Sequence, residues 1–249
     1  MCGIVGFVNN SERAADQGVL EAMNGAIVHR GPDDDGFYVH DNVGLAMRRL
    51  AIIDLAGGKQ PMHNADRTKW IVFNGEIYNY RELRADLEKR GHSFYTNSDT
   101  EAIVHLYDEY GADCLQYLRG MFAIAIWDES DRSLFWHATA WAKAMLYSHQ
   151  PNGDLVFGSE FPAMLEHPSV TRGRLWCDRR LSVLLMRPGA ETAFKQIRKL
   201  EPATGSVGRA ARSRPKGIGC RIFRKRSRSL RLRRSRRQLA SCANRPGSG

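Results

Sequence analysis

The chain has 249 residues, of which 43% are hydrophobic, and this length and composition are sufficient for the core of a globular protein. Its formal net charge is +10, yet residues 1–170 carry 14 Lys and Arg against 24 Asp and Glu, whereas residues 171–249 carry 23 against 3. The overall charge therefore describes no single surface and does not by itself indicate a nucleic-acid-binding protein.

The first part of the chain predicts strands and one helix. Gly3–Val8 is short, apolar and rich in β-branched residues, which is typical of a buried strand. Apolar residues at helical spacing predict a helix over residues 15–28, before the turn-rich segment 29–36. Further strands are expected at residues 37–40, 43–53 and 69–73. We expect Asn74 and Gly75 to form the turn that closes the last of these strands.

The next part predicts helices followed by strands. Amphipathic patterns indicate helices over residues 80–90, Asp99–Tyr110 and 114–118, with Asp99 placed to cap the second helix. Strand character returns at residues 121–127 and 155–157. This order favours an α+β fold in which antiparallel sheets pack on each other under helices. After about residue 170 the periodicity fades and Arg becomes dense, which predicts a disordered tail.

The five cysteines form no CxxC pair, which argues against a structural zinc site and a disulfide framework. No apolar run approaches the roughly 20 residues that a membrane span needs, and the N-terminus lacks the pattern of a signal peptide. We therefore expect a cytoplasmic protein without a metal ion and without a membrane partner.

Cys2 directly follows the initiator methionine. Removal of Met1 before such a small residue leaves an α-amine beside the thiol. Because the reference pKa of an α-amine lies close to neutral pH, the amine can accept the thiol proton through a water without a separate histidine. Taken alone, Cys2 is better interpreted as a small buried residue after a start codon.

Five motifs occur in order across the first hundred residues: MCGIVG, HRGPDDDG, RRLAIIDL, FNGEIYNY and SDTE. With these motifs the chain resembles the class II glutamine amidotransferases of the N-terminal-nucleophile hydrolase group. The resemblance is greatest to the glutaminase domain of asparagine synthase (glutamine-hydrolysing) and covers roughly residues 1–135. It implies a four-layer αββα sandwich with antiparallel sheets. The glutaminase domain would span residues 1–170, and a linker remnant with an Arg-rich tail would span residues 171–249.

The resemblance also implies a role for each matching residue. Cys2 would attack the side-chain amide of glutamine, giving a thioester and ammonia. Asn74, through its side chain, and Gly75, through its backbone N–H, would form the oxyanion hole. Arg49 would bind the α-carboxylate of glutamine and Asp99 its α-ammonium group.

The rest of the glutamine pocket would be lined by the family's RLAII and NGE motifs, which here supply Leu50, Ala51, Ile52, Ile53 and Glu76. His29 is interpreted as a loop organiser rather than a base, since the α-amine fills that role. Cys114 is interpreted as a core residue. No cofactor is expected for the glutaminase domain.

The chain departs from the family at residues 134–148. LFWHATAWAKAMLYS stands where the family has a sequence similar to LFLARDRLGKKPLYY. Codons for the family sequence give FWHATAWAK in a neighbouring frame, which predicts a frameshift near Phe135 and a compensating one near Met145. Codons for the later segments can likewise encode family-like sequences in a neighbouring frame, which indicates that the Arg-rich tail is also out of frame. Because the replaced Arg-Asp-Arg segment would be buried, we expect the sheet to lose a strand around residues 136–145.

The family's synthetase domain activates aspartate with ATP and Mg²⁺ and contains a glycine-rich phosphate loop. No such loop occurs in this chain. The sequence therefore predicts the glutaminase part of an asparagine-synthase-like enzyme. It would hydrolyse L-glutamine and supply ammonia for the ATP-dependent amidation of aspartate by a synthetase domain located elsewhere.

Three other interpretations stay open: an amidotransferase for a different carboxylate, a folded but inactive truncated remnant, and a nucleic-acid-binding protein that acts through its basic tail. The tail has few aromatic residues and no defined nucleic-acid-binding motif, so no specific nucleic-acid partner is expected.

Overall fold

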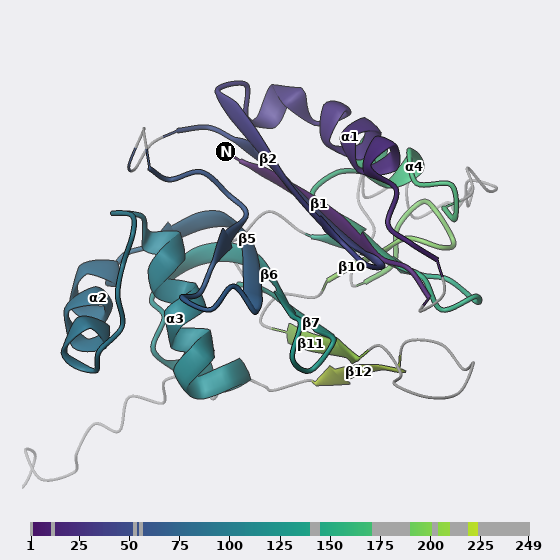
Figure 1. The fold of residues 1–249 in the computed structure, drawn as a ribbon. Helices are drawn as coiled ribbons and strands as arrows, with labels where there is room; N and C mark the ends of the chain where they lie inside the picture. The colour runs from purple at the N-terminus through teal and green to yellow at the C-terminus, as the bar shows by residue number, and fades with distance from the viewer. Residues whose placement is uncertain are drawn as a thin grey trace, which may run out of the picture.

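The computed structural model describes residues 2–10, 13–51, 54, 57–139, 145–170 and 190–200, together with the strands at residues 204–209 and 219–223. In this part of the chain, two six-stranded antiparallel sheets pack face to face, and helices cover both outer faces (Figure 1). The predicted α+β class is confirmed.

The first sheet has the strand order β10-β8-β9-β1-β3-β2. Its strands are β1 (Gly3–Val8), β2 (Asp34–His40), β3 (Val43–Arg49), β8 (Leu146–His149), β9 (Leu155–Gly158) and β10 (Arg198–Lys199). The central strand β1 is buried along its whole length, because sheet residues pack on one face and helices on the other. Its unbroken apolar sequence is the result of this double burial.

Helices α1 (Gln17–Gly25) and α4 (Phe161–Leu165) cover the outer face of the first sheet. The Asp16 carboxylate begins α1 by accepting the N–H of Gly18 at 2.8 Å. Leu20 and Met23 of α1 pack against the outer face of the sheet, and the short turn η1 (Val28–Arg30) follows the helix.

The second sheet has the strand order β12-β11-β7-β6-β5-β4. Its strands are β4 (Met62–His63), β5 (Lys69–Ile77), β6 (Gly120–Asp128), β7 (Ser133–Ala138), β11 (Thr204–Arg209) and β12 (Gly219–Phe223). Helices α2 (Tyr80–Lys89) and α3 (Asp99–Tyr110), followed by the turn η2 (Gly111–Gln116), cover its outer face.

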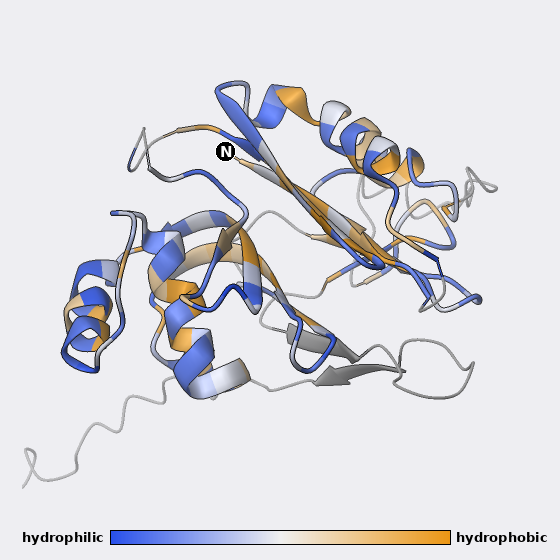
Figure 2. Cartoon of the chain, in the orientation of Figure 1, coloured by the Kyte–Doolittle hydropathy of each residue, from blue (hydrophilic) through white to orange (hydrophobic). Residues whose placement is uncertain are grey.

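The inner faces of the two sheets share one hydrophobic core, to which β1 and β3 contribute Ile4 and Met47 and the opposite sheet contributes Val72 and Trp136. Cys114 is fully buried in the separate core between the second sheet and its helices. Along the helices, hydrophobic and hydrophilic residues alternate around the axis (Figure 2). The four-layer αββα sandwich is therefore confirmed.

Two local predictions were wrong. Asn74 and Gly75 do not end a strand in a turn, because β5 continues through them to Ile77 and pairs with β6 along its whole length. The cap of α3 is Ser98, whose Oγ accepts the N–H of Thr100 at 3.2 Å, whereas Asp99 is the first helical residue. In both cases long-range pairing or a neighbouring hydroxyl overrides the local signal.

The expected loss of a strand near residue 136 is also wrong, since β7 pairs with β6 from Ser133 to Ala138. Side chains still alternate along this strand, so Trp136 faces the inter-sheet core and Phe135 faces the helices. Trp136 Nε1 is buried without a hydrogen-bond partner among the described residues, and an unpaired buried donor costs about 1–3 kcal/mol of stability. Residues 140–144 lie outside the described part of the chain.

Parts of the segment after residue 189 belong to the sheets. The strand β10 pairs with β8, and the β11–β12 hairpin extends the second sheet beyond β7. The predicted linker and tail otherwise lie outside the described residues. Of the helices that the structure describes, none has the length and apolar character needed to cross a membrane.

Candidate active site

One open pocket lies where the ends of β1, β3 and β5 meet the beginning of α3. It is lined by Cys2, Met47, Arg49, Leu50, Gly58, Gln60, Phe73, Gly75, Glu76, Ser98, Asp99 and Thr100. The pocket therefore combines a thiol, a guanidinium group and two carboxylates from four separate segments of the chain.

Cys2 lies half-buried immediately before β1. Its Sγ is 3.4 Å from the backbone nitrogen of Leu50 and 3.6 Å from the carbonyl oxygen of the same residue. The antiparallel register pairs Gly3 with Arg48, so the thiol lies beside the end of β3. Pairing of two central strands thus fixes the position of the thiol.

Arg30 holds the backbone of Cys2 from the other side. Its Nε donates to the Cys2 carbonyl oxygen at 3.0 Å, and one terminal nitrogen lies 3.0 Å from Glu160 Oε1. Burial opposes ionisation of Glu160, but hydrogen bonds from Arg30 and His29 outweigh it and lower the pKa of that carboxyl. The Arg30 side chain is 4% exposed, so it is a structural support for Cys2.

Arg49 is buried at the end of β3 and points into the pocket. One of its terminal nitrogens donates to the Asp54 carbonyl oxygen at 2.7 Å. A Cβ atom on Gly58 would lie 2.2 Å from the same guanidinium group, so only glycine allows the loop to approach Arg49 this closely.

Asp99 is a buried carboxylate in the first turn of α3. Its Oδ2 accepts the N–H of Ile77 at 3.1 Å. Burial raises the pKa of Asp99, and the nearby negative charge of Glu76 adds to this effect, although hydrogen bonds to backbone N–H groups oppose it. A cationic ligand in the pocket would offset both effects by stabilising the ionised carboxylate.

The edge of β5 presents backbone N–H groups to the pocket. The N–H of Phe73 donates to Gln60 Oε1 at 2.7 Å, and the N–H of Ile77 donates to Asp99. Because N–H groups of alternate residues point to the same side of a strand, the N–H of Gly75 faces the pocket between them.

Gly75 itself cannot carry a side chain. Its φ is +156°, and a Cβ atom there would lie 2.2 Å from the carbonyl oxygen of Met121 on β6. The neighbouring Asn74 on the same strand is 7% exposed.

The structure thus brings together most of the residues that the sequence predicts for the site: Cys2, Arg49, Leu50, Gly75, Glu76 and Asp99. Asn74 follows Phe73 on β5 without lining the pocket. Ala51 is not among the lining residues, and its N–H donates to Asp33 Oδ2 at 2.9 Å. Ile52 and Ile53 lie outside the described residues.

The sequence analysis did not predict the lining residues Gln60, Ser98 and Thr100. It also missed Arg30, which does not line the pocket but binds the Cys2 carbonyl oxygen. Ser98 and Thr100 flank Asp99 in the SDTE motif, and Arg30 belongs to the HRGPDDDG motif, so motif membership was the available signal. No motif indicated Gln60, because its position depends on hydrogen bonds to two residues distant in sequence, Thr100 and Phe73.

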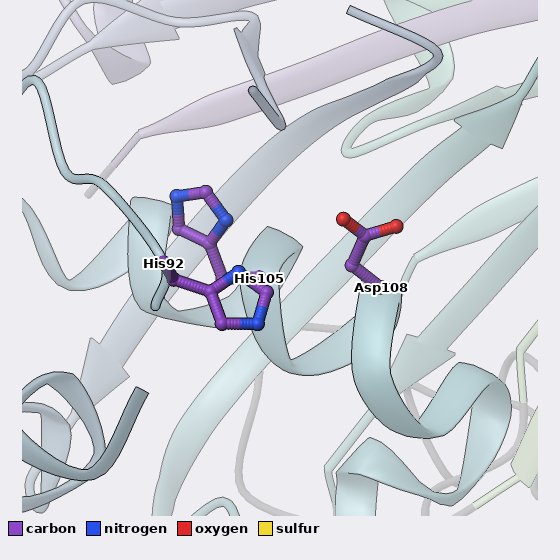
Figure 3. Close-up of side chains that lie close together, drawn as sticks. All are labelled: His92, His105 and Asp108. Carbon is purple, nitrogen blue, oxygen red and sulfur yellow. The ribbon is translucent and has the colours of Figure 1, made fainter. Parts of the chain in front are cut away.

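A second group of titratable side chains lies outside the pocket, on and beside α3 (Figure 3). His92, His105 and Asp108 place potential metal-ligand atoms within 4.8 Å of one another. However, His92 Nε2 lies 2.9 Å from Glu109, and Lys69 Nζ lies 2.8 Å from Asp108. Because Lys69 already neutralises the carboxylate, we assign this cluster to the anchoring of α3 rather than to a metal centre.

The antiparallel αββα sandwich, with Cys2 just before a central strand, is the fold of the N-terminal-nucleophile hydrolases. The family described as "Glutamine amidotransferase domain" matches residues 1–216, and the chain belongs to this family.

Curated relatives include asparagine synthetase (glutamine-hydrolyzing) 1 of Bacillus subtilis (strain 168), which is 37% identical over 82% of this chain and 33% of its own length. Asparagine synthetase (glutamine-hydrolyzing) of Zea mays is 39% identical over 66% of this chain and 28% of its own length. The chain therefore spans about a third of the length of these relatives.

Solved structures show the same fold at low identity. Glutamine phosphoribosylpyrophosphate amidotransferase from B. subtilis superimposes with a TM-score of 0.61 at 17% identity, covering 89% of this chain and 49% of its own. The allosteric regulatory enzyme of purine biosynthesis gives a TM-score of 0.62 at 18% identity, with the same coverage.

Proposed function

We propose that the chain hydrolyses L-glutamine to glutamate and ammonia with the Cys2 thiol as nucleophile. The observation that carries the proposal is the pocket itself, in which Cys2 lies with Arg49, Asp99 and the Gly75 edge of β5. Cys2 would attack the side-chain amide carbon of glutamine. Arg49 and Asp99 would pair with its two charged α-groups, and the Gly75 edge would bind the developing oxyanion.

The first half of the reaction forms a thioester. After removal of Met1, the α-amine of Cys2 takes the thiol proton through a water, and Sγ attacks the side-chain amide carbon of glutamine. The tetrahedral intermediate collapses with cleavage of the C–N bond, and the proton held by the α-ammonium group passes to the departing nitrogen, which leaves as ammonia. Water then hydrolyses the thioester, releasing glutamate and restoring the thiol.

The oxyanion of each tetrahedral intermediate would be bound by the Asn74 amide and the Gly75 N–H. Both donors are held by β5, whose pairing with β6 extends through these residues. Donors fixed in advance cost no reorganisation during the reaction, and loss of one such donor raises the barrier by on the order of 3 kcal/mol.

Selection of glutamine would depend on the two buried charges. The Arg49 guanidinium would bind the α-carboxylate and the Asp99 carboxylate the α-ammonium group, with Leu50 and Glu76 lining the space between. An amide without these groups would gain neither interaction.

The acceptor of the ammonia is proposed from the relatives. As in asparagine synthetases, we propose ATP-dependent amidation of aspartate by a synthetase domain, which would bind ATP and Mg²⁺. The glutaminase domain itself, proposed for residues 1–170 in the cytoplasm, needs no cofactor for the steps above.

Glutamate release from L-glutamine by the purified chain, compared with Cys2→Ala, tests the proposal. Cys114→Ala is the matched control, because burial raises the pKa of the Cys114 thiol to about 12 and keeps it unreactive. We expect activity in the wild type and in Cys114→Ala and none in Cys2→Ala. Activity that survives in Cys2→Ala contradicts the mechanism, and a folded, processed wild type without activity contradicts the function.

A further inference from the structure

Asp54 makes polar contacts to three segments around the pocket. Its carboxylate accepts the N–H of Gly57 at 3.0 Å and, through the other oxygen, the N–H of Asn97 at 2.8 Å. Its carbonyl oxygen accepts the Arg49 guanidinium at 2.7 Å and the N–H of Gly58 at 2.9 Å. One residue thereby joins the end of β3, the loop after it and the segment before α3.

The contact with Asn97 bears on Asp99. Asn97 directly precedes Ser98, which caps α3 through its bond to the N–H of Thr100, and Asp99 is the first residue of that helix. Since a cap fixes where a helix begins, holding Asn97 also holds the Asp99 carboxylate. Asp54 therefore contacts Arg49 directly and restrains Asp99 through two intervening residues.

The backbone of Asp54 lies in the left-handed region, with a φ of 50°. Among residues other than glycine, Asn and Asp adopt this conformation at the lowest cost. The conformation lets one residue direct its carbonyl oxygen at Arg49 while its carboxylate reaches Asn97. A residue such as Ala would lose the carboxylate contacts and also disfavour this backbone.

We infer that Asp54 is a positioning residue that sets the separation between the Arg49 guanidinium and the Asp99 carboxylate, and with it the preference for a substrate that carries both an α-carboxylate and an α-ammonium group. The inference rests on the proposed function. Asp54 does not line the pocket that holds Cys2, so its effect should fall on substrate affinity and selectivity rather than on the chemical step.

The test compares Asp54→Ala with Asp66→Ala as the matched control. Asp66 also accepts a backbone N–H within a loop, that of Thr68, but lies outside the pocket. For Asp54→Ala we expect the KM for L-glutamine to rise about tenfold and kcat to change less than about threefold. The preference for L-glutamine over glutaramate, which lacks the α-ammonium group, should fall by about tenfold, whereas Asp66→Ala should match the wild type.

A second readout does not need turnover. Hydrogen exchange of the Asn97 and Gly57 backbone amides should accelerate in Asp54→Ala and stay unchanged in Asp66→Ala. If Asp54→Ala does not fold, Asp54→Asn carries the test, because Asn tolerates the same φ and keeps one acceptor oxygen. Its KM should lie between those of the wild type and a variant with Arg49 removed.

The outcomes separate the two proposals. An active wild type whose KM and substrate preference are unchanged in the Asp54 variants overturns the positioning role and leaves the proposed function standing. A folded, processed wild type that releases no glutamate overturns the proposed function, and the positioning role with it. A fall in kcat with an unchanged KM in Asp54→Ala also contradicts the inference, because it would place the effect on the chemical step.

Discussion

The backbone nitrogen of Leu50 lies 3.4 Å from the Sγ atom of Cys2, although the two residues are 48 positions apart. The distance is set by the antiparallel pairing of β1 with β3, which brings the start of one strand to the end of the other. The thiol consequently faces the residues that follow β3, and Arg49 lies beside it in the same pocket.

Replacing Arg49 with Ala should raise the KM for glutamine far more than it lowers kcat. In the proposed reaction the guanidinium would contact a carboxylate whose charge does not change, so the contact would contribute equally to the ground and transition states. Steady-state kinetics would check this, with Arg49→Lys expected to recover part of the affinity through its charge. An unchanged KM in Arg49→Ala would remove Arg49 from the binding site.

Replacing Asp99 with Asn should stabilise the folded protein and weaken glutamine binding. Because burial raises the pKa of Asp99, the folded state binds this proton more tightly than the unfolded state. Stability attributable to Asp99 is therefore gained as the pH falls through the folded pKa and is lost as the pH rises. At pH 7 the variant avoids the buried charge, so Tm should rise by about 2–4 °C. A lower Tm would contradict the destabilising effect of the buried charge, and an unchanged KM would contradict the proposed binding of glutamine by Asp99.

The same shift predicts the pH dependence of the wild type. The kcat/KM for glutamine should fall on acidification at a higher pH than an ordinary aspartate would produce, since protonated Asp99 cannot pair with the α-ammonium group. kcat at saturating glutamine should be less affected, because the bound cation lowers the pKa again. A pH profile in Asp99→Asn that still shows this acidic limb would assign it to another group.

Replacing Gly75 with Ala should abolish activity and destabilise the protein. The new Cβ would meet the Met121 carbonyl oxygen at 2.2 Å, so β5 and β6 must separate at the position proposed for the oxyanion hole. Gly25→Ala is the control, because nothing lies within 4 Å of a Cβ atom there. Chemical denaturation and glutamate release would report both effects, and a fully active Gly75→Ala would contradict the proposed use of its N–H.

Replacing Glu160, the ion-pair partner of Arg30, should weaken the support that Arg30 gives to the backbone of Cys2. In Glu160→Ala the Arg30 guanidinium keeps its place behind Cys2 but loses the carboxylate that compensates its buried charge. We expect a loss of about 2 kcal/mol in the free energy of unfolding and a lower kcat. Unfolding and kinetic measurements on the variant would check this, and wild-type values for both would show that Glu160 supports neither.

The sequence predicted the elements whose pattern is local. Gly3–Val8 and Asp99–Tyr110 have the bounds expected from the sequence. The apolar, β-branched run of the strand is buried along its whole length, and the helix is buried from Asp99 to Tyr107. The motifs likewise predicted that Cys2, Arg49 and Asp99 share one pocket, as the structure has them.

Features that depend on distant partners could not be predicted. Asn74 and Gly75 read locally as a turn, and only pairing with β6 keeps them in a strand. Arg30 and Glu160 are 130 positions apart, so nothing near either residue in sequence indicates their ion pair. The strand β7 forms despite its unusual sequence because β6 and β11 supply pairing on both sides.

The most direct test of the central claim compares two forms of the same chain that differ only in Met1. One form begins at Cys2 and the other retains Met1, with both N-termini verified by mass spectrometry and both folds by circular dichroism. If the α-amine of Cys2 is the base, glutamate release and labelling of Cys2 by an electrophilic glutamine analogue should occur only in the form that begins at Cys2. Equal activity in the form that retains Met1 would contradict the account.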